Sequence, residues 1–255
     1  MKRKRLLIVS TALIYIFFVL LCLAYAFSIK HVNADYIIQN GSVRYQKVEN
    51  ILSGYKNKNL CFVDLDKIRA KIEKDEYLKV NKIEKKYPNS INVTVEERKE
   101  MFEITYNSEI YVLDENYFVL NKKSENGDNI KLSLDRAVYD AGSLTVKGTF
   151  KFAKVELENC ILSMLSVFSD WKNLLSEIKV EKIGDYYDNY RVLFKTTQGC
   201  VIEIQQALEQ TEQKVNRSYE TYEGLTDLEK TDTIVKAFYS IKEETVKTVT
   251  EKITD

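Results

Sequence analysis

The sequence contains few of the residues that make turns and few that make reactive sites. There is one proline, Pro88, and there are eight glycines, one histidine and one tryptophan in 255 residues. The chain has no G-x-S-x-G motif, no glycine-rich phosphate loop and no H-E-x-x-H motif, which mark common hydrolases, nucleotide-binding proteins and zinc enzymes. One histidine and scattered cysteines leave a zinc site without ligands at a working spacing. We therefore expect no enzyme activity, no metal and no cofactor.

Acidic pairs are the remaining candidates for chemistry. They occur at Glu96-Glu97, at Asp185 with Asp188 and at Glu243-Glu244. On alternating strands or in turns such pairs are solvated surface, although folding can bring together two carboxylates that the sequence keeps apart. We interpret all three pairs as surface.

The four cysteines form no Cys-x-x-Cys pair. Cys22 lies in an apolar run, and the odd number that remains, Cys61, Cys160 and Cys200, favours free thiols over a disulfide framework. A single disulfide, joining Cys160 to either Cys61 or Cys200, is the alternative.

The charge is balanced, with 38 basic and 38 acidic residues. Four of the basic residues, Lys2, Arg3, Lys4 and Arg5, lie in the first 27 positions, which hold no acid, so the remainder has 34 basic against 38 acidic residues. A slightly acidic remainder lacks the clustered positive charge that binds phosphates. This excludes nucleic acid as a partner.

Residues 6–27 carry no charge and are dominated by leucine, isoleucine, valine, phenylalanine and alanine. An apolar helix of about 20 residues crosses a bilayer, and the basic residues 1–5 keep the N-terminus in the cytoplasm. We expect a single-pass cell-membrane protein with its C-terminus outside. A cleaved signal peptide is the alternative, since Ala24-Tyr25-Ala26 resembles a cleavage site, but the run is longer than a signal h-region. Leu21 before Cys22 excludes a lipoprotein.

Residues 28–98 predict a small domain in the order strand, helix, helix, strand, strand. Residues 28–35 are expected to be a connector in which His31 is a solvated linker residue. The expected elements are a strand at 35–39 ending in the Asn40-Gly41 turn, a helix at 43–52 with Gly54 as its C-cap, an apolar strap at 60–63, a helix after the N-cap Asp64, and strands at 80–87 and 91–95.

Two segments carry a resemblance to a known family. The turn Tyr87-Pro88-Asn89 precedes the strand Ile91-Asn92-Val93-Thr94-Val95 and the ending Glu96-Glu97-Arg98, and the hairpin strand Ile110-Tyr111-Val112-Leu113-Asp114 leads to Phe118-Val119-Leu120. This resembles the FtsQ/DivIB family of bacterial cell-division proteins, which have a single POTRA domain after a transmembrane helix. Tyr117 stands where the family's hairpin often has glycine. The matching motif residues are Tyr87, Pro88, Asn89, Val95, Glu97 and Arg98.

Residues 99–242 predict a mainly antiparallel β domain with covering helices, and residues 243–255 predict a frayed polar tail, so the fold class is α+β. After a polar loop at 124–128, helices are expected at 160–178 and 207–222, and strands at 144–146, 150–155, 178–183, 190–196 and 199–204. Segment 233–241 suits either a strand or a helix. We expect a strand, because the family's sheet ends there.

The resemblance implies a non-catalytic scaffold of the divisome at the division septum. It implies that the chain binds FtsL-like and DivIC/FtsB-like division proteins and helps to control septal peptidoglycan synthesis by FtsW and its transpeptidase. The family's contact surface lies near the last strands, and an open sheet edge accepts a partner strand. By position the candidate contact residues are Tyr190, Val192, Phe194, Ile234, Phe238 and Tyr239. Packing in the core is the competing explanation for each.

Two other functions remain open from the sequence. One is an anchored extracytoplasmic module that binds wall polymers, for which aromatic residues on one face would be expected. The other is a sporulation or secretion scaffold that does not act at the septum.

Overall fold

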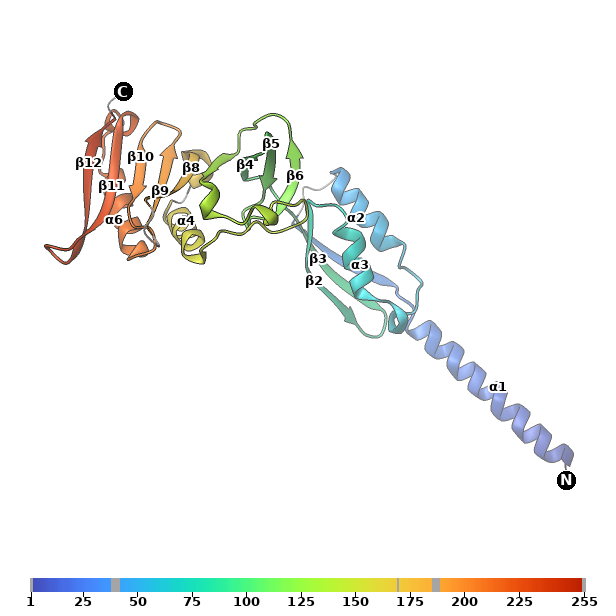
Figure 1. The fold of residues 1–255 in the computed structure, drawn as a ribbon. Helices are drawn as coiled ribbons and strands as arrows, with labels where there is room; N and C mark the ends of the chain where they lie inside the picture. The colour runs from blue at the N-terminus through green and yellow to red at the C-terminus, as the bar shows by residue number, and fades with distance from the viewer. Residues whose placement is uncertain (1, 38–41, 169, 185–188, 254–255) are drawn as a thin grey trace. The chain divides into compact units, whose positions relative to one another are not determined.

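The structure is a computed structural model that describes residues 2–37, 42–168, 170–184 and 189–253, with side chains from Ser10 onward. The chain divides into two compact units, Met1–Arg98 and Lys99–Asp255, which Figure 1 shows as a ribbon. The predicted turn at Asn40-Gly41 and the acidic pair Asp185 and Asp188 lie outside the described residues.

The chain begins with α1 (Lys2–Ala26). In the described part of the chain, no helix is both long enough and apolar enough to cross a membrane. The predicted transmembrane helix at 6–27 and its orientation are thus not confirmed, and the side chains of Lys2, Arg3, Lys4 and Arg5 are outside the described set.

The first unit contains a three-stranded sheet covered by two helices (Figure 1). The strand order is β1-β3-β2, with β1 parallel to β3 and β2 antiparallel to it. This confirms the predicted order of strand, helix, helix, strand, strand. The elements are β1 (His31–Ile37), α2 (Val43–Ser53), the 3-10 helix η1 (Leu60–Phe62), α3 (Leu65–Ile72), β2 (Leu78–Lys86) and β3 (Ser90–Glu97).

The helix ends of this unit follow the local sequence. Ser42 caps α2 by accepting a hydrogen bond from the Tyr45 amide, and Asp64 caps α3 by accepting from the amides of Asp66 and Lys67, as its position predicted. Gly54 is the C-cap of α2. The prediction that His31 lies in a linker is wrong, because His31 is part of β1 and lies opposite Ser90.

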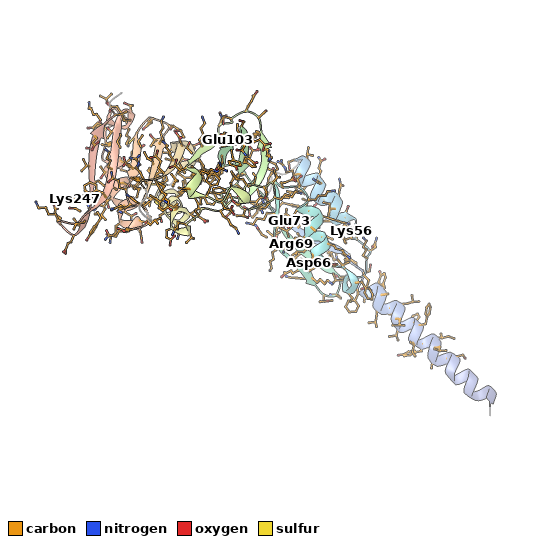
Figure 2. All side chains as sticks on the ribbon, in the orientation of Figure 1. Lys56, Asp66, Arg69, Glu73, Glu103 and Lys247 are labelled. Atoms are coloured by element: carbon orange, nitrogen blue, oxygen red, sulfur yellow. The ribbon has the colours of Figure 1, made fainter. Side chains whose placement is uncertain are left out.

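Helix α3 is fastened to β2 by both members of an ion pair (Figure 2). Arg69 and Glu73 lie one turn apart, with 3.8 Å between Arg69 Nη1 and Glu73 Oε1. Arg69 donates to the Val80 carbonyl at 2.7 Å, and Glu73 accepts from the Val80 amide at 3.0 Å. Beneath them lies a core of 13 buried residues that includes Ile68, Ile72 and Val95.

The second unit contains a nine-stranded sheet with the order β12-β11-β10-β9-β8-β7-β4-β5-β6. Five of its eight strand pairs are antiparallel, and three are parallel, namely β4 with β7, β7 with β8, and β10 with β11. The strands are β4 (Phe102–Tyr106), β5 (Glu109–Leu113), β6 (Val119–Lys123), β7 (Ile130–Leu134), β8 (Leu175–Lys182), β9 (Tyr190–Thr196), β10 (Val201–Ile204), β11 (Thr233–Ser240) and β12 (Thr245–Lys252). The fold is therefore α+β with a mostly antiparallel sheet, as predicted.

Helices of the second unit pack on the sheet, with α6 in contact with β10, β11 and β12 (Figure 1). The helices are α4 (Val155–Val167), the single turn α5 (Trp171–Leu174), α6 (Thr211–Glu223) and the 3-10 turns η2 (Arg136–Val138), η3 (Ala141–Ser143) and η4 (Glu229–Thr231).

Four predicted elements of this unit are wrong. The helix expected at 160–178 ends at Val167, because Phe168 takes an extended conformation, and Leu175–Lys182 is the strand β8. In place of the strands expected at 144–146 and 150–155, residues 144–146 and 150–154 are irregular chain with a bridge from Phe152 to Tyr139, and Val155 begins α4. The polar tail expected from residue 243 contains β12.

The core of the second unit includes an aromatic cluster around Tyr117. Its ring stacks on the Phe102 ring with 5.3 Å between centroids, lies edge to face with the Phe152 ring and is tilted against the Phe150 ring. Tyr117 has a φ of +59°, which explains why glycine suits this position. Tyr117 is 2 % exposed, so this left-handed position carries a buried aromatic side chain in place of glycine. All four cysteines are free thiols, with Cys160 and Cys200 buried.

Candidate functional site

The candidate site is the outer edge of β12, the last strand of the large sheet. β12 pairs with β11 along its whole length, from Thr245 opposite Ser240 to Lys252 opposite Thr233. In the part of the chain that the structure describes, no strand pairs with the other side of β12. An unpaired strand edge exposes backbone donors and acceptors that can accept another strand.

The register shows which backbone groups face outward. The Ile253 amide donates to the Asp232 carbonyl at 2.7 Å, which makes this a hydrogen-bonded pair. Such pairs alternate along an antiparallel ladder, so residues 247, 249 and 251 bond to β11. Val246, Thr248, Thr250 and Lys252 therefore point their N–H and C=O groups away from the sheet.

The two faces of β12 differ. On the helix face, Val246 is buried, and the Thr248 hydroxyl lies 2.8 Å from the Thr221 hydroxyl of α6. On the opposite face, Val249 is 43 % exposed, and Lys247, which Figure 2 labels, pairs with Glu243. An incoming strand would thus find an apolar side chain at Val249 between charged neighbours.

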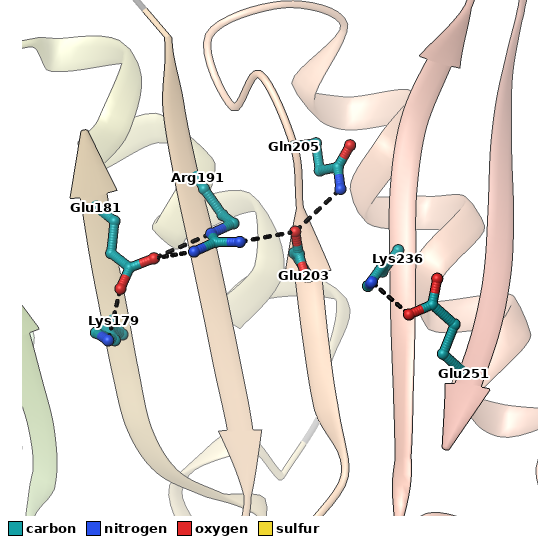
Figure 3. A network of polar contacts seen from close by, with 7 residues as sticks. All are labelled: Lys179, Glu181, Arg191, Glu203, Gln205, Lys236 and Glu251. Atoms are coloured by element: carbon teal, nitrogen blue, oxygen red, sulfur yellow. Dashed lines mark hydrogen bonds and ion pairs between the residues drawn. The ribbon is translucent and has the colours of Figure 1, made fainter. Parts of the chain in front are cut away.

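A ladder of polar side chains crosses the open face of the sheet beside this edge (Figure 3). Glu181 is bonded by Lys179 at 2.5 Å and by Arg191 Nε at 3.0 Å, and Arg191 Nη1 reaches Glu203 at 3.5 Å. Gln205 donates to the same Glu203 carboxylate at 3.0 Å. The hydrogen bonds from Lys179 and then Arg191 lower the pKa of Glu181.

A separate ion pair on the same face joins Lys236 of β11 to Glu251 of β12 (Figure 3). Each partly exposed pair of this kind contributes up to about 1 kcal/mol. Glu203 differs from the others because it is 4 % exposed, and a buried carboxylate is costly without its partners. The ladder therefore fixes the pairing of β8, β9 and β10.

Lys214 is a buried polar group that the sequence analysis missed. Its side chain is 0 % exposed, and its ammonium group donates to the carbonyls of Gln205 and Gln206, both at 2.9 Å. Burial lowers the pKa of Lys214. The residue fixes the turn that carries the chain from β10 into α6, whose face supports β11 and β12. A single lysine in an amphipathic helix gives no signal of this role.

Three predicted contact residues lie in the core. Tyr190 is 5 % exposed, and Val192 and Phe194 are fully buried on the helix face of β9. Their alternation with the half-buried Arg191 and Leu193 follows the period of two of a strand with one covered face. Core packing, the competing explanation, is what the structure shows, and these three side chains are not available to a partner.

The other three predicted residues lie on β11, which is not the edge. Ile234 and Phe238 are half-buried on the open face, where they oppose Glu251 and Lys247 of β12. Tyr239 opposes the buried Val246. The prediction that the sheet ends at 233–241 is wrong, because β12 covers that strand's edge. The β-branched run Thr245, Val246, Thr248, Val249, Thr250 was the available signal.

The family motif residues build the first unit. The Asn89 carbonyl accepts the amide of Lys30 at 2.9 Å and so starts the pairing of β1. Val95 is fully buried, Glu97 pairs with Arg44 at 2.5 Å, and the Arg98 amide donates to Tyr77 at 2.7 Å. Tyr87 and Pro88 are exposed, and their peptide bond is cis. Among the described residues, no three metal-ligating side chains gather.

Residues 27–98 match the family model of the FtsQ-type POTRA domain. The chain is similar to cell division protein DivIB of Clostridium acetobutylicum, with 30 % identity over 142 residues, 54 % of each chain. It is also similar to DivIB of Clostridium tetani, with 28 % identity over 92 residues, 36 % of this chain and 33 % of that one. The predicted resemblance to the FtsQ/DivIB family is confirmed.

The chain spans about half the length of the first of these relatives and a third of the second. A solved structure, the major extracytoplasmic domain of the trans isomer of DivIB from Geobacillus stearothermophilus, matches at 16 % identity. The match covers 47 % of this chain and 87 % of that one, with a TM-score of 0.27.

Proposed function

We propose that this protein is a membrane-anchored, non-catalytic scaffold of the bacterial divisome that captures another division protein on the outer edge of β12. The supporting observation is that the outward backbone groups of Val246, Thr248, Thr250 and Lys252 have no strand partner among the described residues. An edge in this state accepts a strand from a partner by β-augmentation.

The partner is proposed from the resemblance to DivIB proteins. FtsL-like and DivIC/FtsB-like division proteins would bind at β12, and the assembly would help to control septal peptidoglycan synthesis outside the membrane. The charge-free residues 6–27 and the basic residues 2–5 support anchoring through α1 with the second unit outside the cell. Anchoring raises the effective concentration of any partner held in the same membrane.

Replacing Thr250 by proline tests the edge. Because the Thr250 amide points away from β11, T250P removes one outward donor and leaves the pairing with β11 in place. We expect capture of the DivIC-like protein of the same cell, measured as Kd with the purified full chain, to weaken at least about tenfold, which is about 1.4 kcal/mol.

The matched control is T250A, which keeps the amide and removes the same side chain. We expect T250A to bind the partner with the Kd of the unaltered chain. We expect the free energy of unfolding of both variants to lie within about 1 kcal/mol of that of the unaltered chain. Unchanged binding by T250P would rule out the edge. A fluorescent fusion that does not gather at the division site would instead favour the sporulation or secretion scaffold.

A further inference from the structure

The POTRA domain exposes aromatic side chains and lysines at one end. Phe62 in η1 is 88 % exposed, and Tyr87, in the turn between β2 and β3, is 63 % exposed. Lys86 is exposed and Lys85 is half-buried beside that turn. Exposed aromatic rings beside lysines are typical of the boundary between lipid and water.

These residues form one surface, although they come from separate segments. The Lys85 ammonium group donates to the Cys61 carbonyl at 3.3 Å, which joins the end of β2 to η1. The Phe27 ring lies 6.1 Å from the Tyr87 ring, edge to face. The nearby acid Asp64 is occupied as the cap of α3 and pairs with Lys67 at 3.7 Å. We call Lys30, Phe62, Lys85, Lys86 and Tyr87 the basal surface.

The residues that directly follow α1 are hydrogen-bonded to the segments of the basal surface. α1 ends at Ala26, and the next residues are bonded at once to the basal segments. The Leu60 amide donates to Phe27 at 2.7 Å, the Ile29 amide to Lys58 at 2.9 Å, and the Lys30 amide to Asn89 at 2.9 Å. These hydrogen bonds hold the basal surface close to the C-terminal end of α1.

We propose that the basal surface rests on the phospholipid bilayer next to the anchor, so that the POTRA domain has a second membrane contact. This inference rests on the proposed anchoring through α1. Phe62 and Tyr87 enter the headgroup region, where aromatic rings are stable. Lys30, Lys85 and Lys86 keep their stems along the apolar surface and their ammonium groups at the lipid phosphates. The second contact limits how far the domain can tilt.

Single tryptophans report this contact in the full chain. Trp171 is the sole tryptophan, so W171F provides a silent background for F62W in nanodiscs made of phosphatidylcholine and phosphatidylglycerol. We expect lipids brominated near the headgroup to quench F62W emission several-fold more strongly than they quench V43W.

Val43 is a matched control because it is 84 % exposed on the same domain. Its neighbour Arg44 pairs with Glu97, at the end of β3 opposite the Tyr87 turn, which is about 25 Å away for a strand of eight residues. Equal quenching of F62W and V43W would overturn the basal contact.

A third variant, L13W, tests the anchor separately. Strong quenching by deeply brominated lipids, together with equal quenching of F62W and V43W, would keep the anchor and overturn only the basal contact. Absence of quenching at L13W would overturn the anchor, whatever F62W shows. Replacing Lys85 and Lys86 by glutamine is expected to reduce the quenching of F62W. If the basal surface binds an acidic protein and not lipid, the quenching of F62W will equal that of V43W, which would overturn the basal contact.

Discussion

The two edges of the large sheet are treated differently by the rest of the chain. At β6, the Val119 amide donates to Gly148 at 2.8 Å, the Val119 carbonyl accepts from Lys147 at 2.9 Å, and Phe150 donates to Tyr117 at 2.9 Å. At β12, the described residues provide no such cover. Proteins block exposed edges because open ones associate. The chain thus covers the start of β6 and, among the described residues, leaves β12 open, which supports the proposal that a partner strand binds at β12.

The comparison also separates binding residues from core residues. Phe194 is fully buried at the centre of the sheet, whereas its neighbour Leu193 is half-buried on the open face. We expect Phe194→Ala to lower the free energy of unfolding by about 3–5 kcal/mol. Because the loss destabilises the whole sheet, we expect it to affect the pairing at β6 and at β12 together.

Urea denaturation of F194A and L193A measures this effect, with the smaller loss expected for L193A. A partner-binding defect in F194A without a loss of stability would return Phe194 to the binding surface.

The segment that bonds to the outer side of β6 contains Gly148, which lies in a tight turn. A Cβ added at Gly148 would meet Thr145 Oγ1 at 2.5 Å and the Thr145 carbonyl at 2.9 Å. We expect Gly148→Ala to displace the segment from Val119 and to cost about 1–3 kcal/mol, with faster hydrogen exchange at the Val119 amide.

Gly142→Ala is a control in the same stretch, because the three atoms nearest to its added Cβ all belong to the Asp140 side chain, the closest at 3.2 Å. Equal exchange at Val119 in both variants would show that the cover is not held by Gly148.

A smaller effect is expected from pH at the polar ladder. Lys179 and Arg191 lower the pKa of Glu181 below its ordinary value, so its stabilisation is present above the unfolded pKa of about 4.3 and is lost as pH falls through the folded pKa. We expect Glu181→Gln to cost less than about 1 kcal/mol at pH 7 and to cost less at pH 3 than at pH 7.

Urea denaturation of the two proteins at both pH values gives the difference. A difference that grows at low pH has the wrong sign for a depressed carboxyl pKa and would remove Glu181 from the ladder's stabilising contacts.

The sequence was informative where one segment determines its own structure. Asp64 as a cap, Gly54 as a helix end and the strand at 190–196 all follow from local pattern, and the structure has each of them. It was less informative where distant segments decide. Residues 175–178 keep a helical spacing of apolar side chains, yet pairing with Thr196 and Phe194 of β9 makes them a strand.

The edge itself was missed for a related reason. Residues 245–252 contain three charged residues, Lys247, Glu251 and Lys252, and the turn before them has no glycine, asparagine or proline. The left-handed conformation is taken by Glu244, with a φ of +51°, a residue that does not signal such a turn. Polar composition therefore predicted a tail, where pairing with β11 produces a strand.

Amide hydrogen exchange of the full chain, with and without its DivIC-like partner, tests the open edge most directly. Without partner, the outward amides of Val246, Thr248, Thr250 and Lys252 are expected to exchange quickly, and the inward amides of residues 247, 249 and 251 slowly. With partner bound, the outward amides become slow as well. Outward amides that still exchange quickly in the complex would contradict strand addition at β12.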